Sequence, residues 1–544
     1  MTLRITGGRV YDPANGVDGE VRDVCLQDGK VVDDVPDHAT RIDARGRVVM
    51  PGGVDIHAHI AGPKVNAARR LAPEEHRGDV QDRTAIMRSG TGGTVPSTFV
   101  TGYRYALLGY TTVVEAATPP LAARHVLSEL RDTPMIDSLF LLLMGNNVAL
   151  FDLIRRDPAR VRDAVAWWLQ ATGGYGVKLV NPGGVEQWKH GNGNVTSLDE
   201  DVAGVTPRQV LDAITGAVHA LGLPHPVHVH CNNLGVAGNW RTTMDTLRTL
   251  EGRRAHLAHL QFHAYGGKPG GRPRSKAPEI AEYLGAHPEL SADVGQVMFG
   301  PATTMTADAP VSAILRDITN GKWVNADTEV ETGCGIVPFT YKEKNYVHAL
   351  QWGIGLELFL LSRDPWRTVL STDHPNGGSF LSYPRLIRLL MDREFRNEQL
   401  RRANTKAIRS TVLLDDLDRE YTLGEIAIIT RAGPARLLGL EHKGHLGSGA
   451  DADVTIYDER EDREEMFATP RYVIKGGRVV VRDGELVEAL AGDLQRVDVP
   501  HDPDVEDVLR DQFDEHYTVR FENYPVREPW LLEPARRVVA GQPA

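Results

Sequence analysis

The sequence has few cysteines and lacks long apolar tracts. Its 544 residues include only Cys25, Cys231 and Cys334, too few for a disulfide framework or a four-cysteine cluster. This usage is typical of a reducing compartment, and we expect a cytoplasmic protein. Every apolar run is shorter than the roughly 18 residues that a membrane span needs. The N-terminal MTLRITGGRVYD also lacks the apolar core of a secretory signal, so we expect no membrane association.

The charge pattern excludes further classes of protein. The net charge is −12, and the sequence contains no basic block long enough to follow a phosphate backbone, so we expect no nucleic-acid partner. The glycine-rich run SGTGGTVPS (89–97) lacks the strand–loop–helix context and the terminal Lys-Ser/Thr of a phosphate-binding loop. With 41% hydrophobic and 25% charged residues, the composition is that of an ordinary globular protein.

The two ends of the chain share a β-rich pattern. Short apolar runs separated by Gly, Asp and Pro fill residues 1–50, and similar runs return in GSGADADVTIYDE and RYVIKGGRVVVRDGELV. Such runs with turn residues between them predict strands. We expect residues 1–50 and 426–490 to form one small β-sandwich domain, and residues 491–544, which are acidic and carry several aromatics, to form a C-terminal extension that packs on a domain or on a partner.

Between these ends, apolar segments alternate with helical stretches. Residues 157–173 predict one helix, with Asp157 as its cap and Pro158 in its first turn. Strands that alternate with helices favour a parallel sheet, and eight of them favour a (β/α)₈ barrel over residues 51–425. The candidate strands are 54–60, 111–117, 139–145, 175–181, 226–232, 255–261, 291–297 and 368–374.

Metal-binding residue types follow many of these strands. In RVVMPGGVDIHAHI (47–60), His57 and His59 stand two residues apart, which places both on one face of a strand. An isolated pair of this kind could also be an exposed polar end. Barrel enzymes, however, carry reactive groups at the carboxyl ends of their strands, and several other strand ends carry them here: Glu115, Asn146, Lys178, His228 or His230, His256 or His259, and Asp373. The sequence alone does not choose within the two histidine pairs.

Two levels of family resemblance appear in these segments. VMPGGVDIHAHI resembles the first barrel strand of the amidohydrolase superfamily, and GSGADADVTIYD resembles its closing β-domain motif. GVKLVNPGG, VHVHCNNLG, AHLQFHAYGG and LSTDHPNGG are similar to a narrower group, the A-type chains of formylmethanofuran dehydrogenase and of the bacterial formyltransferase/hydrolase complex. The resemblance covers about residues 1 to 490.

The resemblance implies two zinc ions, or similar divalent cations, in the barrel. By motif position, His57 and His59 would hold the first, carboxylated Lys178 would bridge the pair, and His230 and His259 would bind the second. Asp373 would be both a ligand and the catalytic aspartate. Neutral imidazoles and carboxylates are ordinary zinc ligands, and a lysine becomes an anionic bridge by adding carbon dioxide in its neutral form, which burial favours.

The resemblance also implies a substrate, a furan-bearing one-carbon carrier with an acidic tail. Asn146, His228 and His263 are candidates for binding it. The loop AYGGKPGGRPRSK (264–276) is basic, and Lys268, Arg272 and Arg274 are candidates for pairing with the tail. A solvated mobile loop is the alternative interpretation of this segment.

Three functions compete at this point. The first is hydrolysis of formyl-methanofuran, or of a bacterial analogue, to formate and the free amine, in a complex with B, C and D type chains. The arginine-rich, lysine-poor composition favours the formyltransferase/hydrolase version over the dehydrogenase, and the chain carries no cluster motif for a redox step. The second is a cyclic amidohydrolase of the dihydropyrimidinase or hydantoinase type, against which HCNN (230–233) counts. The third is a non-catalytic scaffold chain.

Overall fold

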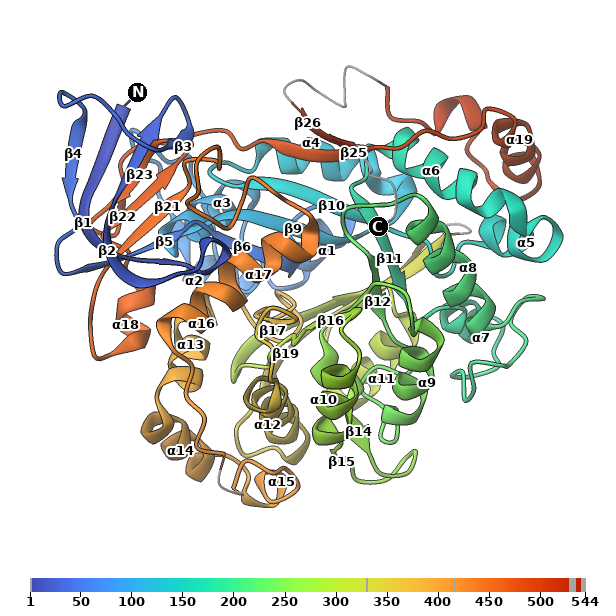
Figure 1. The fold of residues 1–544 in the computed structure, drawn as a ribbon. Coiled ribbons are helices and arrows are strands. Elements are labelled where there is room, and N and C mark those ends of the chain that lie inside the picture. The colour runs from blue at the N-terminus through green and yellow to red at the C-terminus, as the bar shows by residue number, and fades with distance from the viewer. Residues whose placement is uncertain (1, 329–330, 415–416, 528–534, 540–544) are drawn as a thin grey trace.

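A curled parallel sheet lies at the centre of the molecule (Figure 1). The computed structural model describes residues 2–328, 331–414, 417–527 and 535–539. Within these ranges, eight parallel strands follow one another in chain order around the sheet. They coincide with all eight predicted segments and confirm the predicted fold class: β6 (Gly53–Ala58), β9 (Tyr110–Thr118), β10 (Asp137–Leu143), β11 (Gly176–Val180), β12 (Val227–His230), β13 (Ala255–Leu257), β16 (Leu290–Asp293) and β20 (Thr368–Val369).

The first and last strands of this sheet meet through the residues that follow β20. Ala58 forms an isolated parallel bridge with His374, and the His59 amide donates to the His374 carbonyl at 2.7 Å. The Ser371 hydroxyl donates to the His57 carbonyl at 2.8 Å. These bonds place Asp373 beside the two histidines at the end of the first strand.

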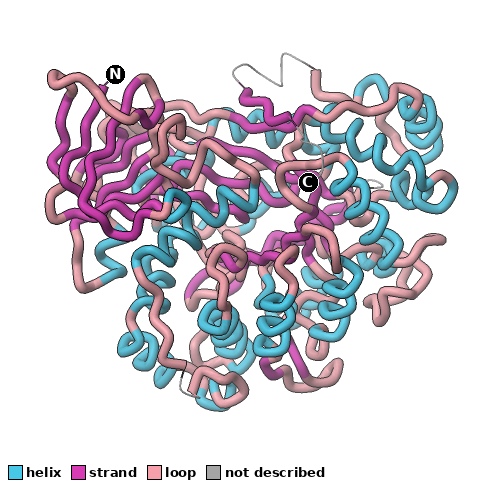
Figure 2. Tube along the Cα trace, in the orientation of Figure 1, coloured by secondary structure: helices cyan, strands magenta, loops and turns pink. Residues whose placement is uncertain are grey.

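Helices surround the outside of the curled sheet (Figure 2). The helix α8 (Pro207–Ala220) begins with a capping box between Thr206 and Gln209, an arrangement that satisfies two free backbone amides. The predicted helix at 157–173 begins later than expected. Pro158–Arg160 forms a separate 3₁₀ turn without a side-chain cap from Asp157, and α6 (Val161–Thr172) follows it.

A second sheet combines both ends of the chain (Figure 1). Among the described residues it contains nine strands, and the β5–β21 ladder joins its N-terminal and C-terminal parts. The ladder is continuous, so the predicted sandwich is one mixed sheet with a shared core of residues such as Ile5, Val24 and Ile456. The strands are β1 (Thr2–Asp12), β2 (Val17–Gln27), β3 (Lys30–Val32), β4 (Thr40–Asp43), β5 (Arg47–Pro51), β21 (Val454–Asp458), β22 (Tyr472–Lys475), β23 (Arg478–Arg482) and β24 (Glu485–Leu486).

An insertion follows β16 and lies near the carboxyl ends of the parallel strands. It consists of β17 (Gly300–Thr306), α11 (Ala309–Thr319), β18 (Val324–Thr328) and β19 (Thr332–Tyr341). The three strands form a small antiparallel sheet. This insertion supplies much of the wall of the cavity described below.

The C-terminal extension packs on the barrel helices. Its helix α19 (Val505–His516) contacts α5 (Val148–Arg156) and α6 (Figure 1). Phe521 and Tyr524 stack on Trp167 at ring-centroid distances of 5.0 and 5.8 Å, and the Trp168 indole donates to the Tyr524 hydroxyl at 3.0 Å. The extension also adds β25 (Leu494–Asp498) beside β10. Trp530, another aromatic of this segment, lies outside the described residues.

None of the described helices is long and apolar enough to cross a bilayer.

A buried cluster of charges links the two sheets. The Lys443 ammonium contacts Asp137 at the start of β10, and Asp453 and Asp451 just before β21, the last two at 2.7 and 3.0 Å. Lys475 contacts the other Asp137 oxygen at 2.7 Å. Burial would lower the pKa of Lys443, but Asp137 and its neighbours raise it well above its ordinary value.

We predict that Lys443→Met destabilises the protein by about 3–5 kcal/mol, because buried carboxylates lose their counter-charge. Urea unfolding followed by intrinsic fluorescence measures this change. Lys322→Met is the control, since Lys322 pairs with Glu74 on the surface and exposed pairs contribute little. Equal unfolding midpoints for the two variants would contradict a linking role for the cluster.

Candidate metal centre and its cavity

The two histidines at the end of the first strand converge on Asp373. The Nε2 atoms of His57 and His59 each lie 3.2 Å from the Asp373 Oδ1 atom. The three side chains are buried, and Asn376 holds the same carboxylate oxygen through a 2.8 Å hydrogen bond. Asp373 has a left-handed backbone with φ 50°, a conformation that asparagine and aspartate tolerate better than most residues. His57, His259 and Asp373 offer ligand atoms that all lie within 4.8 Å of one another, and His59 joins this candidate cation site through its contact with the Asp373 carboxylate.

Lys178 completes this group from β11. Its ammonium lies 3.2 Å from the His57 Nε2 atom, and the side chain is only 1% exposed. Burial lowers the pKa of Lys178 to about 8, although Asp373 and Asp293 oppose the shift. The neutral amine is therefore the minor form at pH 7, but a far larger fraction of Lys178 is neutral than of an ordinary lysine.

A second group of imidazoles adjoins the first. His230, His259 and His263 each offer a ring nitrogen within 4.8 Å of the others. The ring centroids of His230 and His259 are 4.5 Å apart, and the rings of His57 and His259 are 5.2 Å apart. Burial lowers the pKa of all three imidazoles of the second group, which favours the neutral form that binds metals.

Buried carboxylates contact the outer ring nitrogens of three of these histidines. Asp293 lies 2.9 Å from the His57 Nδ1 atom, and Asp308 lies 3.1 Å from the His230 Nε2 atom. Glu115 lies 3.5 Å from the His59 Nδ1 atom. A carboxylate on the far nitrogen of an imidazole is the usual support of a metal-binding histidine. The donor set therefore fits a metal centre.

Glu115 is ionised in spite of its burial. Burial alone would raise its pKa, but the Lys64 ammonium 2.7 Å away brings the pKa of Glu115 down to about 2. Its second oxygen accepts from the amides of Ile60 and Ala61 at 2.7 and 3.0 Å. The residue thus fixes the backbone that follows His59.

The structure distinguishes the members of the two histidine pairs that the sequence left open, His228 or His230 and His256 or His259. His230 and His259 line the cavity described next. His228 lies deeper, with its Nε2 atom 3.1 Å from the His57 Nδ1 atom, and His256 contacts Asp293 at 3.3 Å. This placement supports His230 and His259 as the ligands.

A cavity of about 530 Å³ opens over these groups. Six of the residues proposed for the metals line it, namely His57, His59, Lys178, His230, His259 and Asp373. The remaining wall is mostly apolar and aromatic, with Phe262, Phe339 and Tyr341 among its residues. The Tyr341 hydroxyl donates to the Asn376 carbonyl at 3.0 Å, which connects the aromatic wall to the loop that carries Asp373.

The predicted substrate-binding residues lie outside the cavity lining. Asn146 is tied to the backbone, since its amide donates to the Val180 carbonyl at 2.7 Å and its carbonyl accepts from the Val185 amide at 3.2 Å. His228 and His263 are buried behind the lining residues. Gly270, Gly271 and Pro273 of the basic loop line the cavity, whereas three charged residues of the loop are exposed, namely Lys268, Arg272 and Arg274.

Asp293 and Asp308 were not predicted from the sequence, and Glu115 was predicted only as one of the reactive groups at strand ends. Asp293 ends a strand that was predicted correctly, so a polar residue at that strand end was an available signal. Asp308 lies in the insertion after β16, which no barrel pattern places near β12. Only the folded chain brings it to His230.

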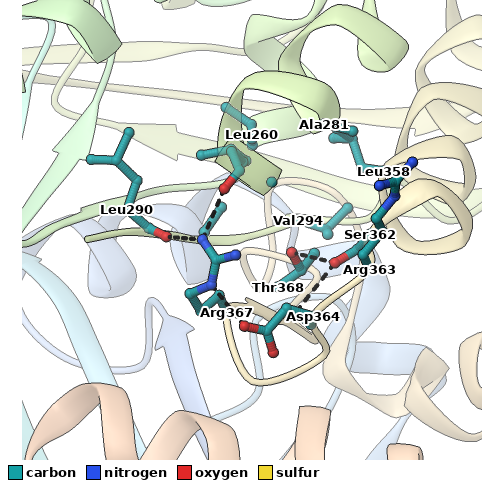
Figure 3. A pocket seen from close by; sticks show the side chains of 13 residues that line it. Leu260, Ala281, Leu290, Val294, Leu358, Ser362, Arg363, Asp364, Arg367 and Thr368 are labelled. Carbon is teal, nitrogen blue, oxygen red and sulfur yellow. Dashed lines mark hydrogen bonds and ion pairs between the residues drawn. The ribbon is translucent and has the colours of Figure 1, made fainter. Parts of the chain in front are cut away.

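Figure 3 shows a different and much smaller hollow. Its volume is about 20 Å³, and Leu290, Ala292 and Val294 of β16 and its continuation line it together with residues of α10 (Ala277–Ala286) and α12 (Tyr346–Leu361). The Arg367 guanidinium donates to the carbonyls of Leu284 and Leu290 at 2.8 and 3.2 Å. This hollow is a packing gap behind the sheet, since its wall offers no group of convergent ligands.

A barrel-like parallel sheet with a buried His/Asp group at its strand ends defines a metal-dependent hydrolase, and the comparisons agree. Residues 40–481 match the model of the Amidohydrolase family, and the chain belongs to that family. Two similar relatives have names that are more specific than the description of the family. The chain is 46% identical to Protein FwdA of Methanocaldococcus jannaschii over 97% of both chains. It is 42% identical to the A chain of the formyltransferase/hydrolase complex Fhc of Methylorubrum extorquens, over 94% of this chain and 95% of that one.

Solved structures are also similar to this chain. The crystal structure of the formyltransferase/hydrolase complex FhcABCD from Methylorubrum extorquens with methylofuran matches with a TM-score of 0.92 and 40% identity, covering 99% of this chain and 100% of that chain. A D-aminoacylase structure matches with a TM-score of 0.51 at 14% identity, covering 90% of this chain and 99% of that chain, which supports the fold alone.

Two of the motifs that carry the narrower resemblance contact each other. The Asn181 amide of the NPGG segment donates to the His230 carbonyl at 2.9 Å, and the Asn232 side chain of HCNN donates to the Asn181 side chain at 2.7 Å. Asn181 also donates to Asp308 at 2.9 Å. Both motifs therefore position His230 and the carboxylate behind it.

We predict that Asp293→Asn weakens the binding of a divalent metal, with zinc as the probe, about 10–100-fold, because His57 loses the charge that orients it. Competition against a chromophoric chelator measures the affinity of the purified protein with any chains that co-purify. Asp317→Asn, which alters an exposed carboxylate on α11, is the control and is expected to bind as the unmodified chain does. Unchanged affinity in Asp293→Asn would show that Asp293 does not support the site.

Proposed function

We propose that this chain is the A-type component of a formyltransferase/hydrolase complex and hydrolyses an N-formyl amide on a methanofuran-type carrier. The products are formate and the free amine. The observation that carries the proposal is the near full-length similarity to the A chain of the Fhc complex, in a chain whose six candidate ligand residues line one cavity.

The donor set fits two divalent cations, which we propose to be zinc. His57 and His59 would hold the first, and His230 and His259 the second. Asp373 would complete the first site, while Lys178 would bridge the two after it adds carbon dioxide and releases a proton. The resulting carboxylate balances part of the charge of the two cations. When bound, such a pair polarises a carbonyl oxygen and lowers the pKa of an attacking water.

Asp373 is the group that moves protons in this proposal. Its Oδ1 atom lies at the meeting point of His57 and His59, and the residue lines the cavity that would hold a formyl group. The carboxylate accepts a proton from the attacking water, and the acid then protonates the departing amine. Asn376 holds the carboxylate in place, so the orientation is set before substrate binds.

The cavity wall suits a carrier with an aromatic ring. Phe339 and Tyr341 pack edge to face at 4.7 Å and would contact a furan ring. Lys268, Arg272 and Arg274 stand on the loop beside the opening and would pair with an acidic tail. The apolar wall would limit access of water to the amide.

The proposal includes partner chains of the B, C and D type, since the similar structure is of a complex called FhcABCD. A cytoplasmic location remains a prediction from cysteine usage. A cyclic-amide substrate receives less support, because the dihydroorotase of Anaeromyxobacter sp. matches only 66 residues, 11% of this chain.

We predict that the zinc-loaded protein, purified with its co-purifying chains, releases formate from an N-formylated furfurylamine carrier. Asp373→Asn should lower the rate at least about 100-fold, because the proton acceptor is lost. An enzymatic formate assay measures the release. Asp317→Asn, with its exposed position on α11, is the control and should release formate at the unmodified rate.

Two results would contradict this assignment. Release from hydantoin or dihydropyrimidine substrates, with none from the formyl carrier, would indicate a cyclic amidohydrolase. A protein that binds no metal and releases no formate would be a scaffold chain.

We further predict that replacing Lys268, Arg272 and Arg274 together by Ala raises KM for the acidic carrier and leaves kcat nearly unchanged. Exposed charges act on binding, and salt screens them. KM measured at low and at physiological salt tests this, with a carrier that lacks its acidic tail as the matched control. A lower kcat at unchanged KM would place the loop in the chemistry instead.

A further inference from the structure

His263 is a buried side chain without an assigned partner. It follows His259 on the 3₁₀ turn Leu260–His263, and its exposure is 0%. Among the described residues, neither its Nδ1 nor its Nε2 atom has a hydrogen-bond partner. A buried polar group left unpaired costs free energy, and such groups in native proteins usually face an ion, a water or a ligand.

Contact with the cavity does not account for the unpaired ring nitrogens of His263. His263 is absent from the residues that line it, so the contact with substrate that the sequence suggested receives no support. Its ring lies against the other two histidines of the second group, 5.1 Å from the His230 ring and 5.3 Å from the His259 ring. The unpaired nitrogens therefore lie among the groups already proposed for a cation.

The ring spacing fits three imidazoles on one ion. With zinc–nitrogen distances of about 2.0–2.1 Å and tetrahedral angles, ring centroids around one ion stand about 5 Å apart. The three pairs among His230, His259 and His263 measure 4.5, 5.1 and 5.3 Å. Their ligand atoms all lie within 4.8 Å of one another.

We propose that His263 is a third imidazole ligand of the second cation, beside His230 and His259. The inference rests on the proposed two-cation site, and it makes the two ions unequal. The first would be held by His57, His59 and Asp373, the second by three neutral imidazoles, with carboxylated Lys178 between them. The site with three imidazoles would retain a borderline-soft ion such as Zn²⁺ in preference to Mg²⁺.

The test replaces His263 by Phe, a ring of similar shape without nitrogen. Because neither ring nitrogen has a partner among the described residues, His263→Phe should be at least as stable as the unmodified chain when both are stripped of metal. After zinc is added, the variant should keep one ion per chain and bind the other at least about 100-fold more weakly, since loss of a supporting residue alone costs about 10–100-fold. Its gain in Tm on zinc addition should shrink accordingly.

Two matched variants distinguish the loss of a metal ligand from an unspecific effect of the substitution. His259→Phe removes an already proposed ligand and should bind as little zinc as His263→Phe does. His219→Phe, at an exposed position of α8, should bind two ions. Unchanged affinity for both ions in His263→Phe would overturn the inference and leave the two-cation site standing. An unmodified chain that binds no zinc would overturn both.

A crystal structure of the unmodified zinc-loaded protein tests the same point if His263→Phe does not fold. The inference requires a ring nitrogen of His263 about 2 Å from a zinc ion. A zinc pair with His263 bonded only to a water would overturn it.

Discussion

The candidate site depends on buried carboxylates that fix the direction of imidazole rings. Asp293, Asp308 and Glu115 each contact one ring nitrogen of a histidine that lines the cavity. Such buried anions are tolerated because they are paired with imidazoles, a lysine or backbone amides. The carboxylates hold the rings in the orientation in which their inner nitrogens can bind a cation.

The closing of the sheet brings the other half of the site into place. The bonds between residues 57–59 and 371–374 join the first and last strands, and they carry Asp373 to His57 and His59. In the same way, the insertion after β16 supplies both Asp308 and the aromatic wall. The fold thus gathers the candidate ligands from the ends of β6, β11, β12, β13 and β20 and places over them a cavity whose lining is largely apolar.

Much of this could be predicted from the sequence. The alternation of apolar strands and helices was strong enough to place all eight parallel strands, and the H-x-H pair with a late aspartate indicated the class of site. The strand pattern alone left His228 and His230 open, because both point to the same face of β12; the family resemblance favoured His230, and the structure places His230, not His228, in the cavity lining. Asp308 could not be placed, since its contact with His230 spans 78 residues and follows no periodic pattern. The helix α6 starts later than predicted because Pro158 begins a separate 3₁₀ turn before it. Asp157 does not cap that turn with its side chain.

We propose that two cations at these strand ends make the chain an amide hydrolase. The most direct test strips the metal from the purified complex and follows formate release from the N-formyl furfurylamine carrier while zinc is returned stepwise. We expect negligible release from the stripped protein and full release as the chain fills with two zinc ions. Full activity in the stripped protein, or none after both ions are bound, would contradict it.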